Sequence, residues 1–178
     1  MRIISGKFKS RRIVAPNKLP VRPTTDMAKE ALFNILNNRY YFDEITFLDL
    51  FAGTGNISYE FASRGCEKIT AVDGDFGCVQ FISKTSDALE LNISAVKSNV
   101  FSYLEKTKNK SDVVFADPPY DMPLEDFERI PELVFKNEIL GEDGVLIIEH
   151  AKQTDLSHLP KFSNKRKYGG SVFSFFEL

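Results

Sequence analysis

The sequence predicts an α/β protein whose mostly parallel sheet is covered by helices on both faces. From residue 45 onward, short apolar runs alternate with segments of helical periodicity. A glycine-rich turn follows the first run, and an acid with two prolines follows the fourth. Strands that alternate with helices form parallel sheets through right-handed crossovers. Ligands bind beyond the carboxyl ends of such strands, so we expect these two loops to face one crevice.

Composition limits the class of protein. A chain of 178 residues with 43% hydrophobic and 27% charged residues is typical of one globular domain. No apolar run approaches the roughly 20 residues of a membrane helix, and no signal-peptide core follows the N-terminus. Cys66 and Cys78 stand singly among apolar neighbours, which indicates reduced thiols without a disulfide or zinc. We expect a cytoplasmic protein with no membrane segment and no metal.

Basic residues are concentrated in one part of the chain. Residues 1–25 hold seven of the 23 basic residues and no acid, which leaves 16 basic against 25 acidic residues elsewhere, a formal charge of −9. A basic arm on an acidic body favours a polyanionic partner. A basic hairpin that only meets solvent is the alternative. The side chains at the tip that would contact such a partner are Lys7, Lys9, Arg11 and Arg12.

The elements can be assigned in order. Apolar runs at 2–5 and 12–15 around the basic tip predict a β-hairpin, and three prolines between residues 16 and 23 keep the following chain extended. Thr25 can cap a helix that ends near residue 38. Residues 1–40 then form an appendage to a core of residues 41–178. In that core we expect strands at 45–50, 68–73, 93–98, 112–116 and 144–149, helices at 57–64, 75–91, 100–107 and 123–136, and a final antiparallel pair around 168–176, giving seven strands. The basic run 161–167 is read as a solvated turn, with an RNA contact as the alternative.

The turn after the first strand indicates a nucleotide-like ligand. Gly53-Thr54-Gly55 lets the backbone approach a ligand closely. Asp73 ends the second strand 20 residues after Gly53, where an acid can accept hydrogen bonds from ribose hydroxyls. The pattern predicts a cofactor that contains adenosine, although a structural turn beside an exposed acid is an alternative. Ser58 replaces the third glycine of the dinucleotide fingerprint, so a nicotinamide cofactor has little support.

The loop after the fourth strand is stiff. In Asp117-Pro118-Pro119-Tyr120 the prolines fix the backbone and remove two N–H donors. Each residue before a proline is pushed toward extended geometry. The tetrapeptide therefore presents a carboxylate, free carbonyl oxygens and one aromatic face. We expect it to hold a flat nitrogenous base and to activate the amino group of that base.

Several motifs resemble those of one enzyme family. Residues 47–55 resemble the first motif of class I S-adenosylmethionine-dependent methyltransferases, and residues 117–120 resemble the tetrapeptide of the amino-methyltransferases in that class. The segments 2–13 and 22–36 are similar to the N-terminal signature of bacterial 16S rRNA guanine-N2 methyltransferases, which modify guanine 966. Tyr168-Gly169 also fits that family. The resemblance covers essentially the whole chain.

The resemblance implies a Rossmann-like class I methyltransferase fold and S-adenosyl-L-methionine as methyl donor. Asp49 would lie near the methionine amino group, and Asp73 would hold the ribose. Asn99 stands where many class members carry an acid that touches adenine, and Val100 would flank the adenine. Arg22 and Thr25 would lie over the crevice. The full set implied for the cofactor is Asp49, Phe51, Gly53, Thr54, Gly55, Asp73, Asn99 and Val100.

The chemistry of the implied reaction assigns roles to the tetrapeptide. The exocyclic nitrogen of guanine is a poor nucleophile because its lone pair is delocalised into the ring. The Asp117 carboxylate and the Pro118 carbonyl can accept its two N–H bonds and aim the lone pair at the methyl group. Tyr120 can stack on the base, which must leave its own stack or loop.

Other functions stay open at this point. An adenine-N6 methyltransferase of DNA would use the same tetrapeptide. A noncatalytic RNA-binding assembly module could keep the same fold, and the intact motifs argue against it. The implied partner is 16S rRNA, in an assembled or assembling small ribosomal subunit, and a monomer is favoured.

Overall fold

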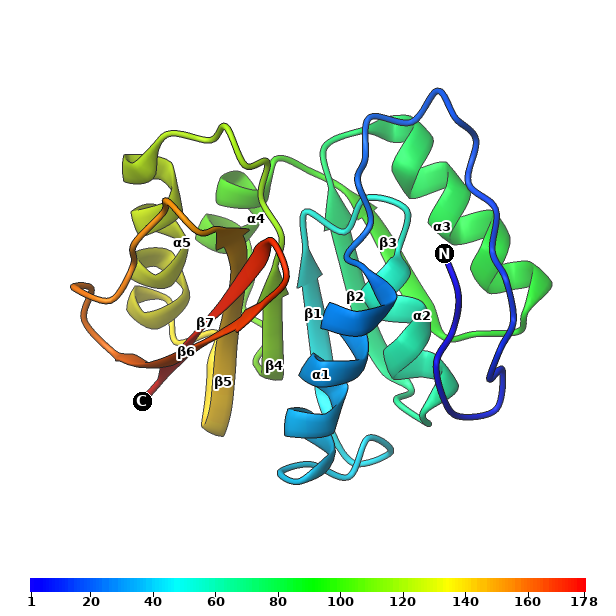
Figure 1. Cartoon of the computed structure of the whole chain (residues 1–178), viewed down its shortest axis with the longest axis horizontal. Helices are drawn as coiled ribbons and strands as arrows, with labels where there is room; N and C mark the ends of the chain where they lie inside the picture. The colour runs from blue at the N-terminus through cyan, green and yellow to red at the C-terminus, as the bar shows by residue number, and fades with distance from the viewer.

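A computed structural model describes the whole chain, residues 1–178, as one seven-stranded sheet between layers of helices (Figure 1). The strand order is β3-β2-β1-β4-β5-β7-β6. Neighbours among the first five strands are parallel, whereas β7 runs antiparallel to both β5 and β6. The strands are β1 (Thr46–Leu50), β2 (Lys68–Asp73), β3 (Ile93–Lys97), β4 (Ser111–Ala116), β5 (Leu140–Ala151), β6 (Phe162–Tyr168) and β7 (Ser171–Glu177). The predicted fold class is confirmed.

Two apolar clusters fill the space on either side of the sheet. Along β1, Phe47 points to one face and Leu48 to the other, because successive side chains of a strand alternate. The Phe47 ring stacks on Phe61 of α2 with their centroids 3.7 Å apart. Helices α1 and α2 cover this face, and α4 and α5 cover the other. The helices are α1 (Asp26–Asn37), α2 (Asn56–Ser63), α3 (Phe76–Ala88), α4 (Val100–Lys106) and α5 (Leu124–Lys136). No helix is both long enough and apolar enough to cross a membrane.

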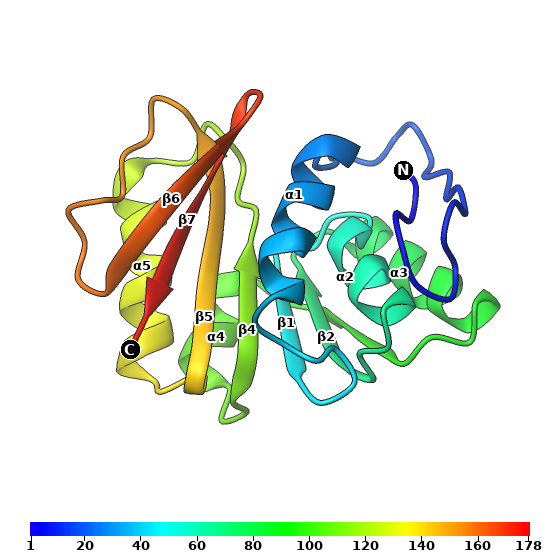
Figure 2. The same cartoon turned by 60° about the horizontal axis from the view of Figure 1, so that its bottom comes forward.

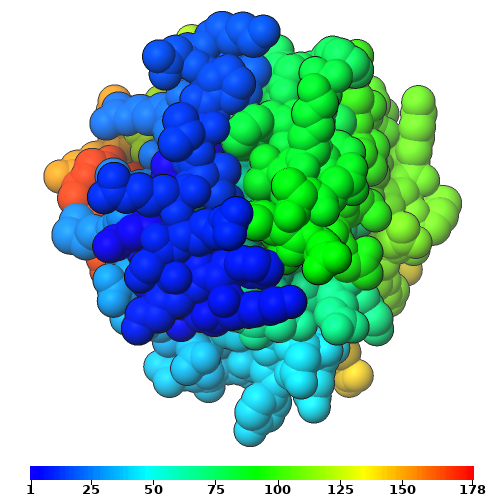
Figure 3. Space-filling view, turned by 90° about the vertical axis from the view of Figure 1, so that its right-hand side faces the viewer, coloured from blue at the N-terminus to red at the C-terminus, as the bar shows by residue number.

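Residues 1–15, the N-terminal arm, fold back on themselves with less regular structure than the sequence predicts. In place of two hairpin strands there is one antiparallel bridge, between Arg2 and Arg12. The reason lies in how the arm packs. Ile3 and Ile13 turn inward and are buried against Tyr59 of α2, while the two limbs still bond to each other through the Ile3 amide to the Arg11 carbonyl at 2.9 Å and the Ile13 amide to the Met1 carbonyl at 3.0 Å. Figure 3 shows the arm lying alongside α3 on the surface of the molecule.

A glycine fixes the arm to α2. Gly6 has a φ of +85°, and a Cβ there would lie 1.9 Å from the Ser63 carbonyl oxygen. Only glycine tolerates both the left-handed conformation and the close approach. The next amide, of Lys7, donates to that same oxygen at 2.7 Å.

A buried ion pair between Lys29 and Glu60 lies under the arm and anchors it to α1 and α2. Lys29 of α1 is fully buried, and its Nζ lies 3.6 Å from Glu60 Oε2. Glu60 in turn accepts the backbone amides of Ile4 and Ser5 at 2.8 and 3.0 Å, and the Arg64 Nε at 2.9 Å. Burial lowers the pKa of Lys29, and the Glu60 charge opposes that shift. One carboxylate therefore joins α1, α2 and the arm.

The C-terminal part differs from prediction in two strands. The basic run 161–167, read as a turn, lies almost entirely within β6, the edge strand of the sheet (Figure 2). Its backbone pairs with β7 from Phe162 to Tyr168, and this pairing outweighs the low apolar content of the segment. Strand β5 is also longer than predicted, beginning at Leu140 and ending at Ala151.

Candidate active site

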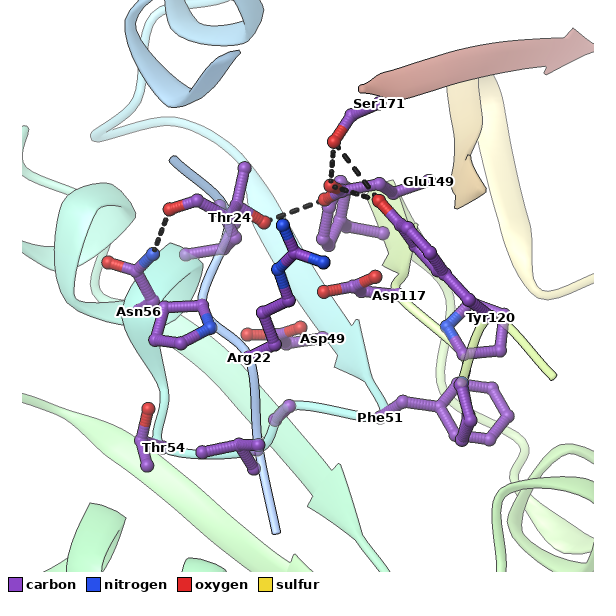
Figure 4. A pocket seen from close by; sticks show the side chains of 18 of the residues that line it. Arg22, Thr24, Asp49, Phe51, Thr54, Asn56, Asp117, Tyr120, Glu149 and Ser171 are labelled. Atoms are coloured by element: carbon purple, nitrogen blue, oxygen red, sulfur yellow. Dashed lines mark hydrogen bonds between the residues drawn. The ribbon is translucent and has the colours of Figure 1, made fainter. Parts of the chain in front are cut away.

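A cavity of about 600 Å³ opens at the carboxyl ends of β1, β2, β4 and β5 (Figure 4). This volume is in the range of small-molecule and cofactor sites. The glycine turn forms one part of its wall and the Asp117 loop another, as the strand order predicts. The predicted site residues that line it are Arg22, Thr25, Asp49, Phe51, Gly53, Thr54, Asp73, Asp117, Pro118 and Tyr120.

Other predicted site residues lie outside the wall. Gly55 sits just behind the turn, where it caps α2 with a φ of +85°. Asn99 caps α4 by accepting the Ser102 amide at 3.1 Å, and Val100 is buried in the first turn of that helix. The assignment of Asn99 and Val100 to the cofactor stays a prediction. Lys7, Lys9, Arg11 and Arg12 are exposed on the N-terminal arm, away from the wall.

The glycine turn is held in place by Asp73. Its two carboxylate oxygens accept the backbone amides of Gly53 and Asp75, both at 2.8 Å. Each oxygen keeps a second lone pair that can face a ligand. Phe51, with a φ of +57°, adopts the left-handed conformation although it is not glycine. Such strain is concentrated at functional loops.

Three carboxylates from three neighbouring strands share the floor of the cavity. Asp49 of β1 and Glu149 of β5 lie on the face that carries α1, and Asp117 follows β4 on the same face. The parallel register pairs Ala116 with Ile148, so Asp117 and Glu149 occupy the next matched positions. Adjacent strands are about 4.8 Å apart. The arrangement concentrates negative charge at the end of the sheet.

Asp49 is almost completely buried, as is Glu149. The Asp49 side chain is only 2% exposed, and its Oδ2 accepts the Ser58 hydroxyl at 2.6 Å. Burial raises the pKa of Asp49 to about 7, and the Ser58 hydrogen bond opposes this rise. The group therefore titrates near neutral pH and responds strongly to a nearby cation.

Asp117 and Glu149 have contrasting environments. Glu149 accepts hydroxyls from Thr24 at 2.6 Å and Ser171 at 2.8 Å, with Tyr120 at 3.5 Å. Burial raises the pKa of Glu149, and those hydroxyls oppose the rise. The pKa of Asp117 is raised well above its ordinary value by burial, then by the charges of Glu149 and Asp49. Asp117 thus faces the cavity as a carboxylate that readily takes a proton.

A chain of hydrogen bonds connects Glu149 to the N-terminal arm. Thr24 donates to Glu149, and the Thr24 carbonyl accepts the Asn56 side-chain amide at 3.1 Å. The Asn56 Oδ1 accepts the Lys29 ammonium at 2.8 Å, and Lys29 faces the carboxylate of Glu60 that binds the arm. A continuous and largely buried network of polar contacts therefore connects Glu149 to the residue that binds the arm.

Tyr120 stands at the rim. Its side chain is 42% exposed, so one ring face is available to a planar group. Its hydroxyl lies 3.1 Å from the Ser171 hydroxyl, which fixes the ring at the edge of the cavity. Thr25 lines the cavity and also caps α1, where its hydroxyl accepts the Ala28 amide at 3.3 Å, so both predicted roles are compatible.

Sequence reasoning missed part of the wall. Glu149, Thr24, Asn56 and Ser171 line the cavity and were not singled out. Glu149 could have been predicted from the sequence, because an acid at the carboxyl end of a parallel strand lies at the edge of the sheet where ligands bind. The other three are brought in by long-range packing, which has no local signature.

Comparison with known proteins places the chain in a defined group. The family described as "Conserved hypothetical protein 95" matches residues 1–177. Ribosomal RNA small subunit methyltransferase D of Escherichia coli strain K12 is 30% identical over 161 residues, which cover 90% of this chain and 79% of that protein.

Solved structures give the same fold. The yhhF protein of Escherichia coli superposes with a TM-score of 0.86 at 29% identity, over 99% of this chain and 96% of that one. A T. thermophilus 16S rRNA N2 G1207 methyltransferase in complex with AdoMet and guanosine has a TM-score of 0.69 at 22% identity, over 89% of this chain and 45% of that one. The second likeness is one of fold.

Proposed function

Because this chain belongs to the conserved hypothetical protein 95 family, we propose that it transfers a methyl group from S-adenosyl-L-methionine to the exocyclic N2 of a guanine in 16S rRNA. The observation that carries the proposal is the shared cavity. The glycine turn and the Asp117 tetrapeptide, which come from different strands, line one space large enough for a cofactor beside a base. The named relative is a small-subunit rRNA methyltransferase.

The residues present suit this cofactor. S-adenosyl-L-methionine supplies an electrophilic methyl group on a positively charged sulfonium. Asp49, Asp117 and Glu149 give the cavity floor negative charge that complements a cation. Asp73 keeps free lone pairs for ribose hydroxyls beside the Gly53 backbone. Phe51 and Thr54 complete this side of the wall.

The Asp117 loop acts on the base. The Asp117 carboxylate and the Pro118 carbonyl accept the two N2–H bonds and hold the nitrogen lone pair in line for attack. A new N–C bond forms as the methyl–sulfur bond breaks, and the bonding pair leaves with sulfur. Positive charge develops on nitrogen, where Asp117 stabilises it. Tyr120 stacks on the base and keeps it in plane.

The surplus proton needs an acceptor after transfer. The carboxylate of Asp117 lies in hydrogen-bonding reach of the amine in this arrangement, and its pKa is raised by burial and by Glu149. A raised pKa makes Asp117 a better proton acceptor than an exposed aspartate. One residue therefore orients the nucleophile first and takes its proton afterwards.

The substrate is proposed to be presented by an assembled or assembling small subunit in the cytoplasm. The exposed basic side chains at the arm tip would contact RNA phosphates next to the target. A monomer without a metal is sufficient for this scheme, because every proposed role falls to a residue of one chain.

The proposal is tested by incubating the protein with labelled S-adenosyl-L-methionine and unmodified small-subunit particles, naked 16S rRNA or DNA. Label should enter RNA, and calorimetry should show cofactor binding. A protein that binds RNA but has no affinity for the cofactor would be a noncatalytic assembly module, which refutes the proposal.

A further inference from the structure

The Asp117 loop recognises an amine but does not by itself tell guanine from adenine. Both bases carry an exocyclic amino group that the loop can hold. They differ at the adjacent ring nitrogen. Guanine carries a hydrogen on N1, so its edge reads donor, donor, acceptor from N2 through N1 to O6. Adenine has a lone pair on N1. The group that faces this ring nitrogen therefore decides which base fits.

We propose that Glu149 selects guanine by accepting the N1–H bond of the base whose amine Asp117 holds. This inference rests on the proposed function. The strand register provides the first argument. Asp117 and Glu149 occupy matched positions on adjacent parallel strands and face the same cavity. Side by side on neighbouring strands, the two carboxyl groups can converge on the two adjacent donors of the guanine edge, N2–H and N1–H.

The surroundings of Glu149 keep it an acceptor. Thr24 and Ser171 hold its carboxylate from two sides at 2.6 and 2.8 Å, and Glu149 is only 2% exposed. An ionised carboxylate has about four lone-pair sites, of which Thr24, Ser171 and Tyr120 use three. The Tyr120 contact, at 3.5 Å, is the weakest. One lone-pair site of Glu149 remains for a ligand. A second becomes free if the Tyr120 hydroxyl leaves Glu149 when the ring stacks on the base.

Arg22 completes the pattern. Its guanidinium lies beside Glu149 over the cavity (Figure 4) and is not committed to any ion pair in the chain. It is placed to donate to O6, the acceptor next to N1. Asp117, Glu149 and Arg22 thus offer acceptor, acceptor and donor. Adenine would present a lone pair to Glu149 and a C–H group toward Arg22, so it is rejected by repulsion and by an unpaired buried charge.

The test replaces the target guanine in a small-subunit rRNA substrate with 2-aminopurine. This base keeps the N2 amine but has neither the hydrogen on N1 nor the oxygen at C6, so it removes the contacts proposed for both Glu149 and Arg22. The wild-type protein should prefer guanine by about 10- to 100-fold in kcat/KM, the range expected for a hydrogen bond to a charged group. In Glu149→Gln the amide can either accept or donate, so the preference should shrink at least tenfold. Glu142→Gln, an exposed acid at the far end of β5, is the matched control and should keep the wild-type preference.

The outcomes separate the two proposals. If the wild-type protein methylates guanine and 2-aminopurine equally, or if Glu149→Gln keeps the full preference, the role of Glu149 is refuted while the methyltransferase function stands. If the wild-type protein methylates no guanine-containing rRNA although it binds the cofactor, the proposed function itself fails. Because 2-aminopurine also lacks O6, the change of preference between wild type and a Glu149 variant assigns the effect to Glu149, and Glu149→Asp is the second variant if Glu149→Gln does not fold. Glu149→Asp should retain the guanine preference at a lower rate.

Discussion

Replacing Asp117 by alanine tests the catalytic role of this side chain without disturbing the rest of the cavity. The Asp117 carboxylate makes no hydrogen bond to another side chain, and its pKa is raised by burial and by the charges of Glu149 and Asp49. Its removal therefore leaves no buried partner unsatisfied. Loss of one preorganised contact to a developing charge costs about 2.7–4 kcal/mol, which corresponds to a fall of about 10²- to 10³-fold in kcat.

The same substitution should leave the fold as stable as before or more stable. The raised pKa means that ionisation of Asp117 costs the native state free energy. That cost begins as pH rises above the ordinary value of 3.8 and is complete above the raised pKa. The stability advantage of Asp117→Ala should consequently grow as pH rises above about 4 and be absent below that pH.

The assay for Asp117→Ala compares single-turnover methyl transfer, cofactor affinity by calorimetry and thermal unfolding. Asp121→Ala, an exposed acid four residues further on, is the control and should behave as wild type. We expect lost transfer with cofactor affinity within a few-fold of wild type. Transfer reduced less than threefold, or cofactor binding lost together with transfer, would refute the assigned role.

Three further perturbations test other parts of the account. Replacing both Arg11 and Arg12 by alanine should weaken RNA binding and reduce the slope of log K against log salt by about 1.4 to 1.8, as measured by binding titrations at several salt concentrations. Cofactor affinity should rise with pH up to about 7 and then level off, because Asp49 has a pKa of about 7 and its ionised form attracts the cation; Asp49→Asn should flatten this profile in calorimetry from pH 5.5 to 8.5. Lys29→Met should lower the free energy of unfolding in urea by about 1–3 kcal/mol, because it removes the ammonium that faces Glu60 while Arg64 and two backbone amides still contact that carboxylate.

For each of these three predictions, one experimental result would contradict the reasoning. For the arm, alanine at Lys108 and Lys110, which are exposed outside the arm, is the matched control, and an equal change of salt slope in both proteins would mean that the arm is not the RNA contact. For Asp49, a cofactor affinity independent of pH in the wild type would contradict the assignment. For Lys29, a loss below about 1 kcal/mol would show that the ion pair contributes little to holding α1 and the arm.

The fold was predictable because its signals are local. Apolar runs of strand length alternate with helical periodicity, and Gly53-Thr54-Gly55 and Asp117-Pro118 mark the loops between them. Their positions at strand ends also predicted that both loops would share one crevice, since parallel strands end on the same side. The predicted and observed element boundaries differ most where pairing with a neighbouring strand determines the structure. In β6, polar residues form a strand because their backbone bonds to β7.

The remainder of the site depends on contacts between distant parts of the chain. Thr24 reaches Glu149 across 125 positions, and Asn56 connects Thr24 to Lys29. Nothing in the sequence near any of these residues marks the connection. The arm shows the same limit, because nothing near Ile3 or Ile13 in the sequence marks their burial against Tyr59 of α2. Tertiary packing decides both arrangements.

The central claim is that the Asp117 loop methylates the N2 of a guanine in small-subunit rRNA, and nucleoside analysis tests it most directly. Unmodified small-subunit particles are incubated with the protein and labelled S-adenosyl-L-methionine, and the rRNA is digested and resolved by chromatography and mass spectrometry. The account predicts label in N2-methylguanosine, lost in Asp117→Ala. Label in N6-methyladenosine, or none in RNA despite cofactor binding, would contradict it.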